Sequence, residues 1–366
     1  MPAVTDRPVS VVLVGFGLGG RLFHAPLIAA TADLSLDAIV TGNPERAAQA
    51  AQAYPDATIY ATPEQAWAGG HDLAAISTAN VSHVPYATAA LSAGLNVVLD
   101  KPVAGDAATT RELADLARIQ QRHLIPYQNR RWDSDIRTAQ RVLAEGSLGD
   151  VHRFESRIVK MRVIPKEGWR GSAAPEDMGG LLYDLGVHAI DQAMQLMGPV
   201  VSVGAWVRSI RDADPTDDDT TVILTHTSGA ISIVTVSQVT AIGEPRMLLL
   251  GTRGGLRIDA IDAQEAELAA GRDPAEADWG VRLPGTEALL RTYDDASNPT
   301  DERVILERGA WPDFYAQAAA AIRGTGPDPV TIEDVIETMR VMDAAWAAAE
   351  TSTIVRLDPP AAHAPH

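Results

Sequence analysis

The sequence predicts an α/β protein whose first part carries a parallel sheet and whose second, α+β part carries a mainly antiparallel sheet. In the first half, short apolar runs alternate with helix-like segments, which is typical of right-handed crossovers between parallel strands. In the second half, strand-like segments follow one another directly and are joined by turn signals such as Ser228-Gly229. We therefore expect two domains, at 1–126 and 127–366.

The bulk properties exclude several classes of protein. A chain of 366 residues can bury two cores, and its 46% hydrophobic and 21% charged residues are typical of a soluble globular protein. The absence of cysteine excludes disulfides and thiolate chemistry. The net charge of −18 opposes binding to nucleic acid or to an anionic membrane. With neither a signal-peptide pattern nor a long apolar run, we expect a cytoplasmic protein without membrane or nucleic-acid partners.

The elements of the first half follow from its apolar runs and its breakers. Pro44, Pro63, Pro85 and Gly94 separate the helices, and a further helix over 106–121 places Leu113, Leu116 and Ile119 on one face. The expected parallel strands are 9–14, 34–40, 73–77, 96–99 and 123–126.

The second half begins with a helix near 133–145 and ends with a helix over 331–350. The expected strands between them are 201–207, 220–227, 230–239, 246–250 and 256–259. The closing helix has a buried stripe at helical spacing, made of Ile332, Val335, Ile336, Met339, Met342 and Trp346. The acidic run 212–219 is expected to be a solvated loop, and 259–309 is too weakly patterned to assign.

The first strand runs directly into a glycine-rich turn, which is typical of a dinucleotide-binding βαβ unit, the Rossmann motif. In such turns one glycine permits the tight bend, one lets the backbone approach a pyrophosphate, and one lets helix and strand pack closely. The cofactor-binding residues expected here are Gly15, Phe16, Gly17, Leu18, Gly19 and Gly20. An ordinary strand–turn–helix joint is the alternative.

The end of the second strand bears on the choice of dinucleotide. Enzymes that use NAD place an acidic residue about 20 positions after the glycines, where it binds the ribose hydroxyls. Here that position is Thr41, which would not repel a 2′-phosphate, and Asn43 and Arg46 follow it. A guanidinium can clamp a phosphate in bidentate fashion, so NADP(H) is favoured and NAD(H) stays possible. The alternative is that Arg46 is only a surface residue.

Candidate catalytic groups occur at two places. Lys101 follows the fourth expected strand, and ligands of parallel sheets bind at the carboxyl ends of strands. Asp184 and His188 are four residues apart, so they share one face of a helix, which Gln192 and Gln195 extend. A histidine beside a carboxylate can act as a general base, although a solvated polar face would show the same spacing.

A polar run after the last parallel strand suits a ligand rich in hydroxyl groups. Its members expected to bind substrate are Asn129, Arg131, Trp132 and Asp133, and an interdomain salt-bridge cluster is the alternative. A glycine at position 186 in a helix interior would cost about 1 kcal/mol of helix stability relative to alanine, and close approach of a ligand would explain why it is there.

Trp169 and Arg170, which precede a Gly-Ser-Ala-Ala-Pro segment, could form a substrate loop or a surface turn.

Taken in order, these motifs resemble the glucose-fructose oxidoreductase/inositol dehydrogenase/rhizopine catabolism (Gfo/Idh/MocA) family over nearly the whole chain. The motifs are Gly15-x-Gly17-x-x-Gly20, Asp100-Lys101-Pro102, Asn129-Arg130-Arg131-Trp132-Asp133 and Asp184-x-x-x-His188. Segments including Phe23-His24-Ala25-Pro26 look most like the branch with NADP-dependent scyllo-inositol dehydrogenases. Asp100 departs from the glutamate that is usual before the lysine and shortens its reach.

The resemblance implies a Rossmann domain followed by a domain with a large open sheet, through which the chain would form a homodimer or homotetramer. It places the catalytic roles on Lys101, Asp184 and His188, and further cofactor contacts on Lys101, Thr78, Asn80 and His83. A lysine electrophile makes a metal unnecessary.

The expected activity is transfer of hydride between a nicotinamide and a secondary alcohol or ketone of a cyclic polyol or sugar. His188 would take the hydroxyl proton, Lys101 would stabilise negative charge on that oxygen, and Asp184 would orient the site and bind a neighbouring hydroxyl. The alternatives are a cofactor-binding regulator without turnover and a reductase of a non-sugar carbonyl or dihydrodiol. The substrate's identity, its stereochemistry and the direction of the reaction are not predicted.

Overall fold

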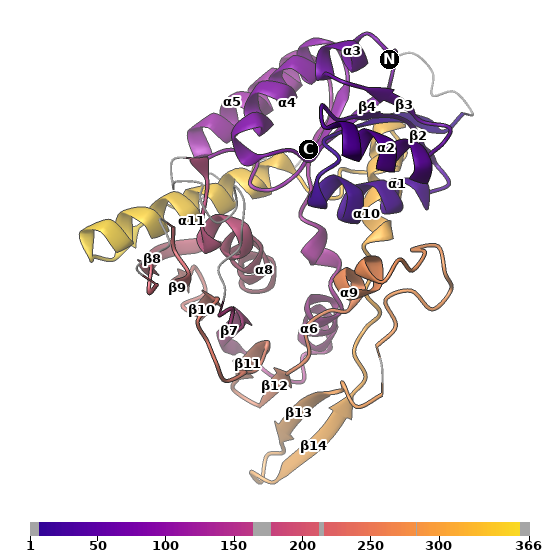
Figure 1. Ribbon diagram of the computed structural model, residues 1–366. Coiled ribbons are helices and arrows are strands. Elements are labelled where there is room, and N and C mark those ends of the chain that lie inside the picture. Colours follow the sequence, from indigo (N-terminus) through magenta and orange to yellow (C-terminus); the bar gives the residue numbers. More distant parts are fainter. Residues whose placement is uncertain (1–6, 164–176, 212–215, 283, 359–366) are drawn as a thin grey trace.

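The computed structural model describes residues 7–163, 177–211, 216–282 and 284–358 (Figure 1). Two sheets organise these residues, and they confirm the predicted fold class: a six-stranded parallel sheet near the N-terminus and a nine-stranded, mostly antiparallel sheet after it. No helix in these ranges is long and apolar enough to cross a bilayer.

The parallel sheet has the strand order β3-β2-β1-β4-β5-β6, so the order reverses between β1 and β4. Every residue of β1, β4 and β5 except Asn96 is buried, because helices cover both faces of a parallel sheet. The strands are β1 (Val9–Val14), β2 (Leu34–Val40), β3 (Thr58–Tyr60), β4 (Leu73–Ile76), β5 (Asn96–Leu99) and β6 (Leu124–Pro126).

Two helices of this part, α2 (Pro44–Ala53) and α5 (Ala107–Ile119), begin at side-chain caps that the sequence supplies. Asn43 accepts a hydrogen bond from the backbone N–H of Arg46, and Asp106 accepts one from that of Thr109. The others are α1 (Ala25–Ala29), which continues a π-helical turn at Gly20–His24, α3 (Pro63–Trp67) and α4 (His83–Ser92). On the expected apolar face of α5, Leu113 is buried whereas Ile119 at the helix end is exposed.

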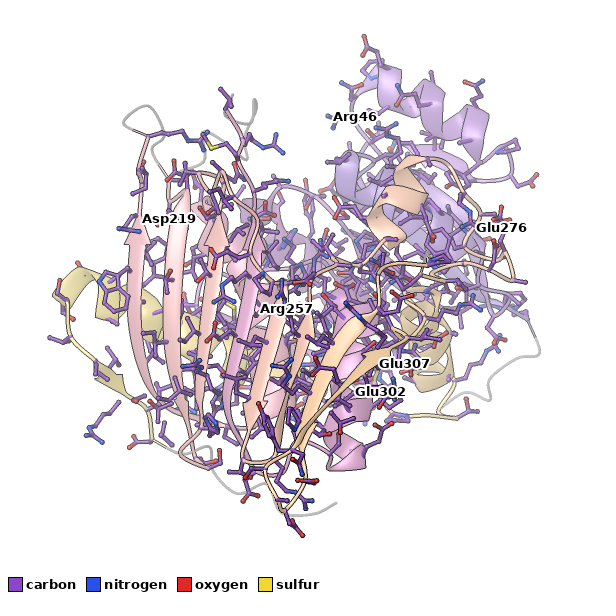
Figure 2. All side chains as sticks on the ribbon, turned by 90° about the horizontal axis from the view of Figure 1, so that it is seen from below. Arg46, Asp219, Arg257, Glu276, Glu302 and Glu307 are labelled. Atoms are coloured by element: carbon purple, nitrogen blue, oxygen red, sulfur yellow. The ribbon has the colours of Figure 1, made fainter. Side chains whose placement is uncertain are left out.

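The second sheet has the order β14-β13-β12-β11-β7-β10-β9-β8-β15. Only the central pair β7 and β10 is parallel. The strands are β7 (Val151–Val159), β8 (Val200–Arg208), β9 (Asp219–His226), β10 (Ile231–Ser237), β11 (Met247–Gly251), β12 (Gly254–Ile258), β13 (Ala288–Tyr293), β14 (Pro299–Val304) and β15 (Val355–Arg356). Figure 2 shows these strands side by side, with Asp219 of β9 toward the left and Glu302 of β14 toward the right.

Helices of the second half cover one face of this sheet and also reach the first. Helix α11 (Ile332–Thr351) contacts β8 and α8 (Val187–Met197) in the second part and α5 in the first, while α10 (Pro312–Ile322) packs against α1 and β2. The remaining helices are α6 (Ser134–Glu145) and α9 (Gln264–Ala269). The chain therefore crosses back to the first sheet, and the domain boundary at 126/127 stays a prediction.

Five strands and two helices of the structure were not expected from the sequence. They are β3, β7, β13, β14, α9 and α10, together with the two-residue strand β15 as a fifth strand, and three of them fill the segment that was left unassigned. Strand β7 lies in the middle of the nine-stranded sheet, although its sequence carries charged residues at every second position from Arg153 to Arg157.

Candidate active site

The glycine turn lies where the order of the parallel sheet reverses. Gly15 has a φ of +100°, and a Cβ on it would lie 2.2 Å from the carbonyl oxygen of Ser77 after β4. A Cβ on Gly20 would lie 1.9 Å from the carbonyl oxygen of Gly15, whereas one on Gly17 would meet nothing nearer than Arg46 Nη1 at 3.8 Å. Gly15 and Gly20 thus allow backbone segments to pack, and Gly17 leaves open the space that a dinucleotide backbone needs.

A cavity of about 1600 Å³ extends from this turn to the second sheet. Its wall contains most of the expected cofactor residues, and its volume exceeds that of an ordinary small-molecule site. The expected residues that line it are Gly15, Phe16, Gly17, Leu18, Gly19, Thr41, Asn43, Arg46, Thr78, Lys101, Asn129, Asp184 and His188. Gly20 lies behind the turn and is not part of this wall.

Asn80 and His83 also lie outside the cavity wall. The Nδ2 of Asn80 donates to the carbonyl oxygen of Met178 at 2.9 Å. The Nδ1 of the buried His83 lies 2.8 Å from the carbonyl oxygen of Pro102, and burial lowers the pKa of this histidine. In the structure both side chains therefore bind protein carbonyls that flank the site.

Lys101, Asp184 and His188 come together in the cavity although more than 80 residues separate the lysine from the other two. Lys101 follows β5, Asp184 lies in a π-helical turn at Leu182–Gly186, and His188 lies in the first turn of α8. The Nζ of Lys101 lies 3.0 Å from Oδ1 of Asp184 and also donates to that residue's carbonyl oxygen. These contacts fix the ammonium group within a site that His188 also lines.

Gly186 ends the π-helical turn, and a packing contact within this turn accounts for a small residue at this position. A Cβ at this position would lie 2.8 Å from Cδ1 of Leu182, so the glycine makes room for a neighbouring side chain. Gly186 does not line the cavity, and the expected approach of a ligand to it stays a prediction. The two glutamines that were expected to extend the polar face of Asp184 and His188 differ in exposure. Gln192 is buried, whereas Gln195 is exposed to solvent.

His188 is buried in the cavity wall and hydrogen-bonded. Its Nδ1 lies 2.8 Å from the amide oxygen of Gln128, and only 4% of the residue is exposed. Burial, together with the positive charges of Lys101 and Arg130, holds the pKa of His188 well below its ordinary value. The imidazole is therefore unprotonated near neutral pH and can accept a proton.

Asp100 forms a second buried network beside the lysine. Its Oδ2 accepts from Ser77 Oγ at 2.9 Å and lies 3.4 Å from Nε2 of His24, whose Nδ1 lies 2.6 Å from the hydroxyl of Tyr315. Burial acts to raise the pKa of Asp100, but the hydrogen bond and charge of His24, with the charges of His83 and Lys101, lower it below its usual range. The carboxylate thus stays ionised, and its Oδ1 accepts from the backbone N–H of Lys101 at 2.8 Å.

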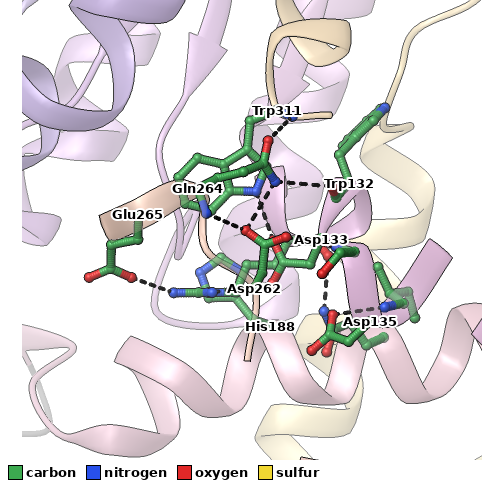
Figure 3. A network of polar contacts seen from close by, with 12 residues as sticks. Trp132, Asp133, Asp135, His188, Asp262, Gln264, Glu265 and Trp311 are labelled. Atoms are coloured by element: carbon green, nitrogen blue, oxygen red, sulfur yellow. Dashed lines mark hydrogen bonds and ion pairs between the residues drawn. The ribbon is translucent and has the colours of Figure 1, made fainter. Parts of the chain in front are cut away.

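The polar run after β6 divides between the cavity and the protein interior. Arg131 pairs with Asp191 at 2.6 Å and with Asp334 at 3.0 Å, outside the cavity wall. Asp133 is fully buried, accepts from Trp311 Nε1 at 2.7 Å, and has its pKa raised well above the ordinary value by burial and by Asp262. Figure 3 shows this network beside His188.

Trp132 is partly buried, with its ring edge-on to Phe314 and its carbonyl oxygen bound by Gln264. None of Arg131, Trp132 and Asp133 lines the cavity, so their contact with substrate stays a prediction, and Trp169 and Arg170 lie outside the described residues. Arg130, which was not among the expected residues, lines the cavity next to Asn129.

Gln128 and His24 were also missing from the expected site residues. Gln128 follows a parallel strand by two residues, so the rule that ligands bind at strand ends could have flagged it. His24 carried no signal beyond its place in a segment of the family pattern. In the described ranges no group of three His, Asp or Glu side chains is placed to hold a metal ion.

Comparisons with known proteins agree with this geometry. Residues 9–128 match the model of the oxidoreductase family with an NAD-binding Rossmann fold, and residues 136–257 match the GFO/IDH/MocA C-terminal domain. The oxidoreductase YdgJ of Escherichia coli is 33% identical over 92% of this chain and 94% of its own. The scyllo-inositol 2-dehydrogenase (NADP(+)) IolW of Bacillus subtilis is 29% identical over 96% of both chains.

A solved structure of the Bacillus subtilis oxidoreductase yvaA superposes with a TM-score of 0.91 at 28% identity, over 97% of this chain and all of that one. The fold, the site and these similarities together identify the protein as an oxidoreductase of the Gfo/Idh/MocA family.

Proposed function

We propose that this enzyme is an NADP(H)-dependent oxidoreductase that interconverts a secondary alcohol and a ketone on a cyclic polyol or sugar of the inositol type. The observation that carries the proposal is the meeting of the Lys101 ammonium group and the His188 imidazole in one cavity that begins at the glycine turn. The NADP specificity and substrate in the name of the relative IolW support the same reading.

A dinucleotide fits the residues at the glycine turn. Gly15 and Gly20 leave no room for a Cβ, while Gly17 borders open cavity, as expected where a pyrophosphate approaches the backbone. Phe16, Leu18 and Thr78 would enclose it, and Thr41, Asn43 and Arg46 would face its adenosine end. When bound, the nicotinamide supplies or accepts the hydride.

The proton is handled by His188. Because the Gln128 amide oxygen can only accept, the hydrogen of the imidazole resides on Nδ1, and Nε2 is the nitrogen that takes the proton from the substrate hydroxyl. In the reverse direction the same nitrogen returns the proton. The low pKa of His188 makes its neutral form abundant at neutral pH.

Lys101 and Asp184 handle charge and orientation. The Lys101 ammonium group stabilises negative charge that develops on the reacting oxygen. Asp184 holds the ammonium group at 3.0 Å, and its carboxylate can accept a hydrogen bond from a neighbouring hydroxyl of a polyol. A substrate with vicinal hydroxyl groups satisfies both residues at once.

The preference for NADP(H) is assigned to the end of β2. Thr41 and Asn43 carry no carboxylate that would repel a phosphate. The Nη1 atom of Arg46 lies 3.8 Å from the position that a Cβ on Gly17 would take. Arg46 is exposed on α2, as Figure 2 shows, so its guanidinium is free to turn toward a phosphate. Glu64 lines the same end of the cavity, so a substitution of this residue serves as a control for changes at Arg46.

Coenzyme titrations test this preference. Replacing Arg46 by alanine is expected to weaken NADPH binding by about 10- to 100-fold with little effect on NADH, as for loss of a charge-assisted phosphate contact. Glu64→Gln should leave the order of the two coenzymes unchanged. Equal affinities of the unaltered enzyme for NADPH and NADH would remove the role of Arg46.

The activity itself is tested by a substrate screen. Inositol isomers, aldoses and aldonic acids are offered with NADP+ and NAD+, and formation of the reduced nicotinamide is followed by its absorbance. Oxidation of a polyol or sugar supports the proposal. Tight binding of NADP(H) without turnover of any of them would indicate a regulator, and turnover confined to dihydrodiols or non-sugar carbonyls would assign another substrate class.

The open face of the nine-stranded sheet is the proposed contact between copies. Trp206 on β8 and Ile231 on β10 are 54% and 42% exposed on the face that the helices leave uncovered. Isolated apolar residues are common on surfaces, but large ones on an uncovered sheet favour burial by a second copy. Light scattering should show a dimer or tetramer, and Trp206→Lys should shift it toward the monomer.

A further inference from the structure

The cavity wall opposite the glycine turn is formed by the end of β7 and carries a row of cationic side chains. The backbone continues in extended form beyond the strand, because Lys160 N–H donates to Ser237 and Arg162 N–H donates to Gln238, both at carbonyl oxygens. Side chains alternate along an extended strand, so Lys160 and Arg162 share the face of Phe154 and Ser156. That face packs toward α8, the helix that carries His188.

The other arginines of this wall are neutralised within the protein. Arg246 pairs with Asp135 at 2.9 Å, Arg157 pairs with Glu244 at 2.8 Å, and Arg130 pairs with Glu265 at 3.0 Å. Each of these three arginines therefore has a carboxylate of the protein as its counterion and needs none from a ligand.

Arg162 differs from them. Among the residues that the structure describes, no carboxylate lies within ion-pair distance of its guanidinium group, and its Nε is buried without a hydrogen-bond acceptor. Its backbone carbonyl faces a further cation, since it accepts from Nη1 of Arg211 at 3.0 Å. Burying an N–H of a cation without an acceptor is unfavourable, and an anionic group in the cavity would remove that cost.

The carboxylates of the wall do not supply that anion. Asp184 is held by Lys101, Asp100 lies against His24, and Asp259 pairs with Arg257 at 2.8 Å. The chain as a whole has a net charge of −18 and repels anions at long range, so a specific cation in the site is needed to bind one.

We infer that Arg162 binds an anionic substituent of the substrate, so that the enzyme acts on an acidic sugar or polyol in preference to a neutral one. This inference rests on the proposed function and specifies its substrate class. A planar guanidinium group pairs with either a carboxylate or a phosphate in bidentate fashion. The substituent is thus a sugar carboxylate or a sugar phosphate, held at the β7 end of the cavity while the reacting hydroxyl lies at Lys101 and His188.

The test compares sugars that share a ring and differ in charge. Glucose and galactose are offered as the neutral sugar, as the 6-carboxylate and as the 6-phosphate. Calorimetric binding to the full-length enzyme saturated with NADP+ is measured beside turnover. The expected result is an anionic form at least about tenfold preferred over its neutral parent, and the better of the two anions identifies the substituent.

Substitutions assign that preference to Arg162. Arg162→Gln is expected to reduce the selectivity for the anion over the neutral sugar by about tenfold, and Arg162→Lys by less, because lysine keeps the charge and loses the bidentate geometry. Arg118→Gln removes an equal charge from the exposed face of α5 and controls for the change in net charge. High salt should weaken binding of the anion in the unaltered enzyme more than in Arg162→Gln.

The inference is overturned if the neutral forms bind as well as the anions, or if Arg162→Gln keeps the full selectivity. Binding of the anions that depends on Arg162 but leads to no turnover would instead contradict the proposed function and leave the anion site standing. Turnover of neutral polyols alone would support the proposed function and remove the anion site.

Discussion

The Nδ1 atom of His188 lies 2.8 Å from the amide oxygen of Gln128, and the two residues come from different parts of the chain. The contact fixes both the tautomer and the orientation of the imidazole, because an amide oxygen accepts and does not donate. Gln128 follows β6 of the parallel sheet, and His188 begins α8 of the second part. His188 is therefore positioned by a residue from the edge of the sheet that also supplies Lys101.

Removing the amide oxygen should reduce catalysis without removing the base. In Gln128→Leu the imidazole loses the partner that selects its tautomer, and we expect kcat to fall by about 10- to 100-fold. Gln128→Glu keeps an acceptor but adds a negative charge, which should raise the pKa of His188 and move the acid limb of the pH profile upward. Turnover of Gln128→Leu within twofold of the unaltered enzyme would show that this contact is dispensable.

His188→Ala tests the base directly. We expect turnover to fall by about 10²- to 10⁴-fold, the range for loss of a positioned general base. The binding of NADPH, followed by its fluorescence, should be retained, since His188 lies away from the glycine turn in the cavity wall. If turnover survives within a few fold, another group removes the proton.

The pH dependence follows from the direction of the pKa shift of His188. Burial and the charges of Lys101 and Arg130 lower its pKa well below the ordinary value of 6.5. Alcohol oxidation needs the neutral base, so kcat/KM should stay level as pH falls through 6.5 and should drop only at more acidic pH. Arg130→Met removes one of the lowering charges and should move that drop upward.

The same shift bears on stability. At pH values between the lowered pKa of His188 in the folded protein and 6.5, the unfolded chain binds more protons than the folded chain. The free energy of unfolding that His188 contributes is therefore lost as the pH falls through this window. Urea unfolding at several pH values should show this loss in the unaltered protein and less of it in His188→Gln. An equal loss in both would assign it to other groups.

Much of the first sheet could be predicted because burial there leaves a plain record in the sequence. Val9–Val14, Leu34–Val40 and Asn96–Leu99 are short apolar runs between breakers, and their predicted bounds agree with the structure. Strand β14 could not be predicted, because five of its six residues are exposed and no apolar residue alternates along it. Strands β7 and β13 alternate only in part, with exposed charges that also suit a loop.

The proposed catalytic residues were easier to predict than the residues that line the rest of the cavity. Asp184 and His188 are four residues apart, so spacing predicted that these two lie close, and Lys101 was predicted from its place at a strand end. The run from Asn129 to Trp132 instead forms a 3₁₀ turn, and the turn decides which side chains reach the cavity. Arg131 and Asp133 find buried partners 60 and 178 residues away, which no local pattern encodes.

The network behind Lys101 predicts a role for His24. Its imidazole lies between the Tyr315 hydroxyl and the Asp100 carboxylate, and it lowers the pKa of Asp100. In His24→Asn the pKa of Asp100 should rise, and kcat/KM should fall by about tenfold as the carboxylate that binds the Lys101 N–H loses its partner. Tyr315→Phe keeps the imidazole and should cost less. Equal activity of His24→Asn and the unaltered enzyme would reduce His24 to a packing residue.

The glycine turn offers a stability test with an internal control. In Gly15→Ala the new Cβ would lie 2.2 Å from the Ser77 carbonyl oxygen at a φ of +100°, so backbone as well as side chains must move. We expect a loss of about 3 kcal/mol or more in the free energy of unfolding, together with loss of NADPH binding.

Gly70→Ala shares the positive φ, at +75°, but its Cβ would meet nothing within 4 Å. It should therefore cost only the conformational penalty, about 1 kcal/mol, and leave cofactor binding intact. The difference between the two variants isolates the close approach of β1 and β4. If both alanines cost the same, the contact between Gly15 and Ser77 does not constrain the turn, and the case for a dinucleotide cradle at this point of the sheet loses its structural basis.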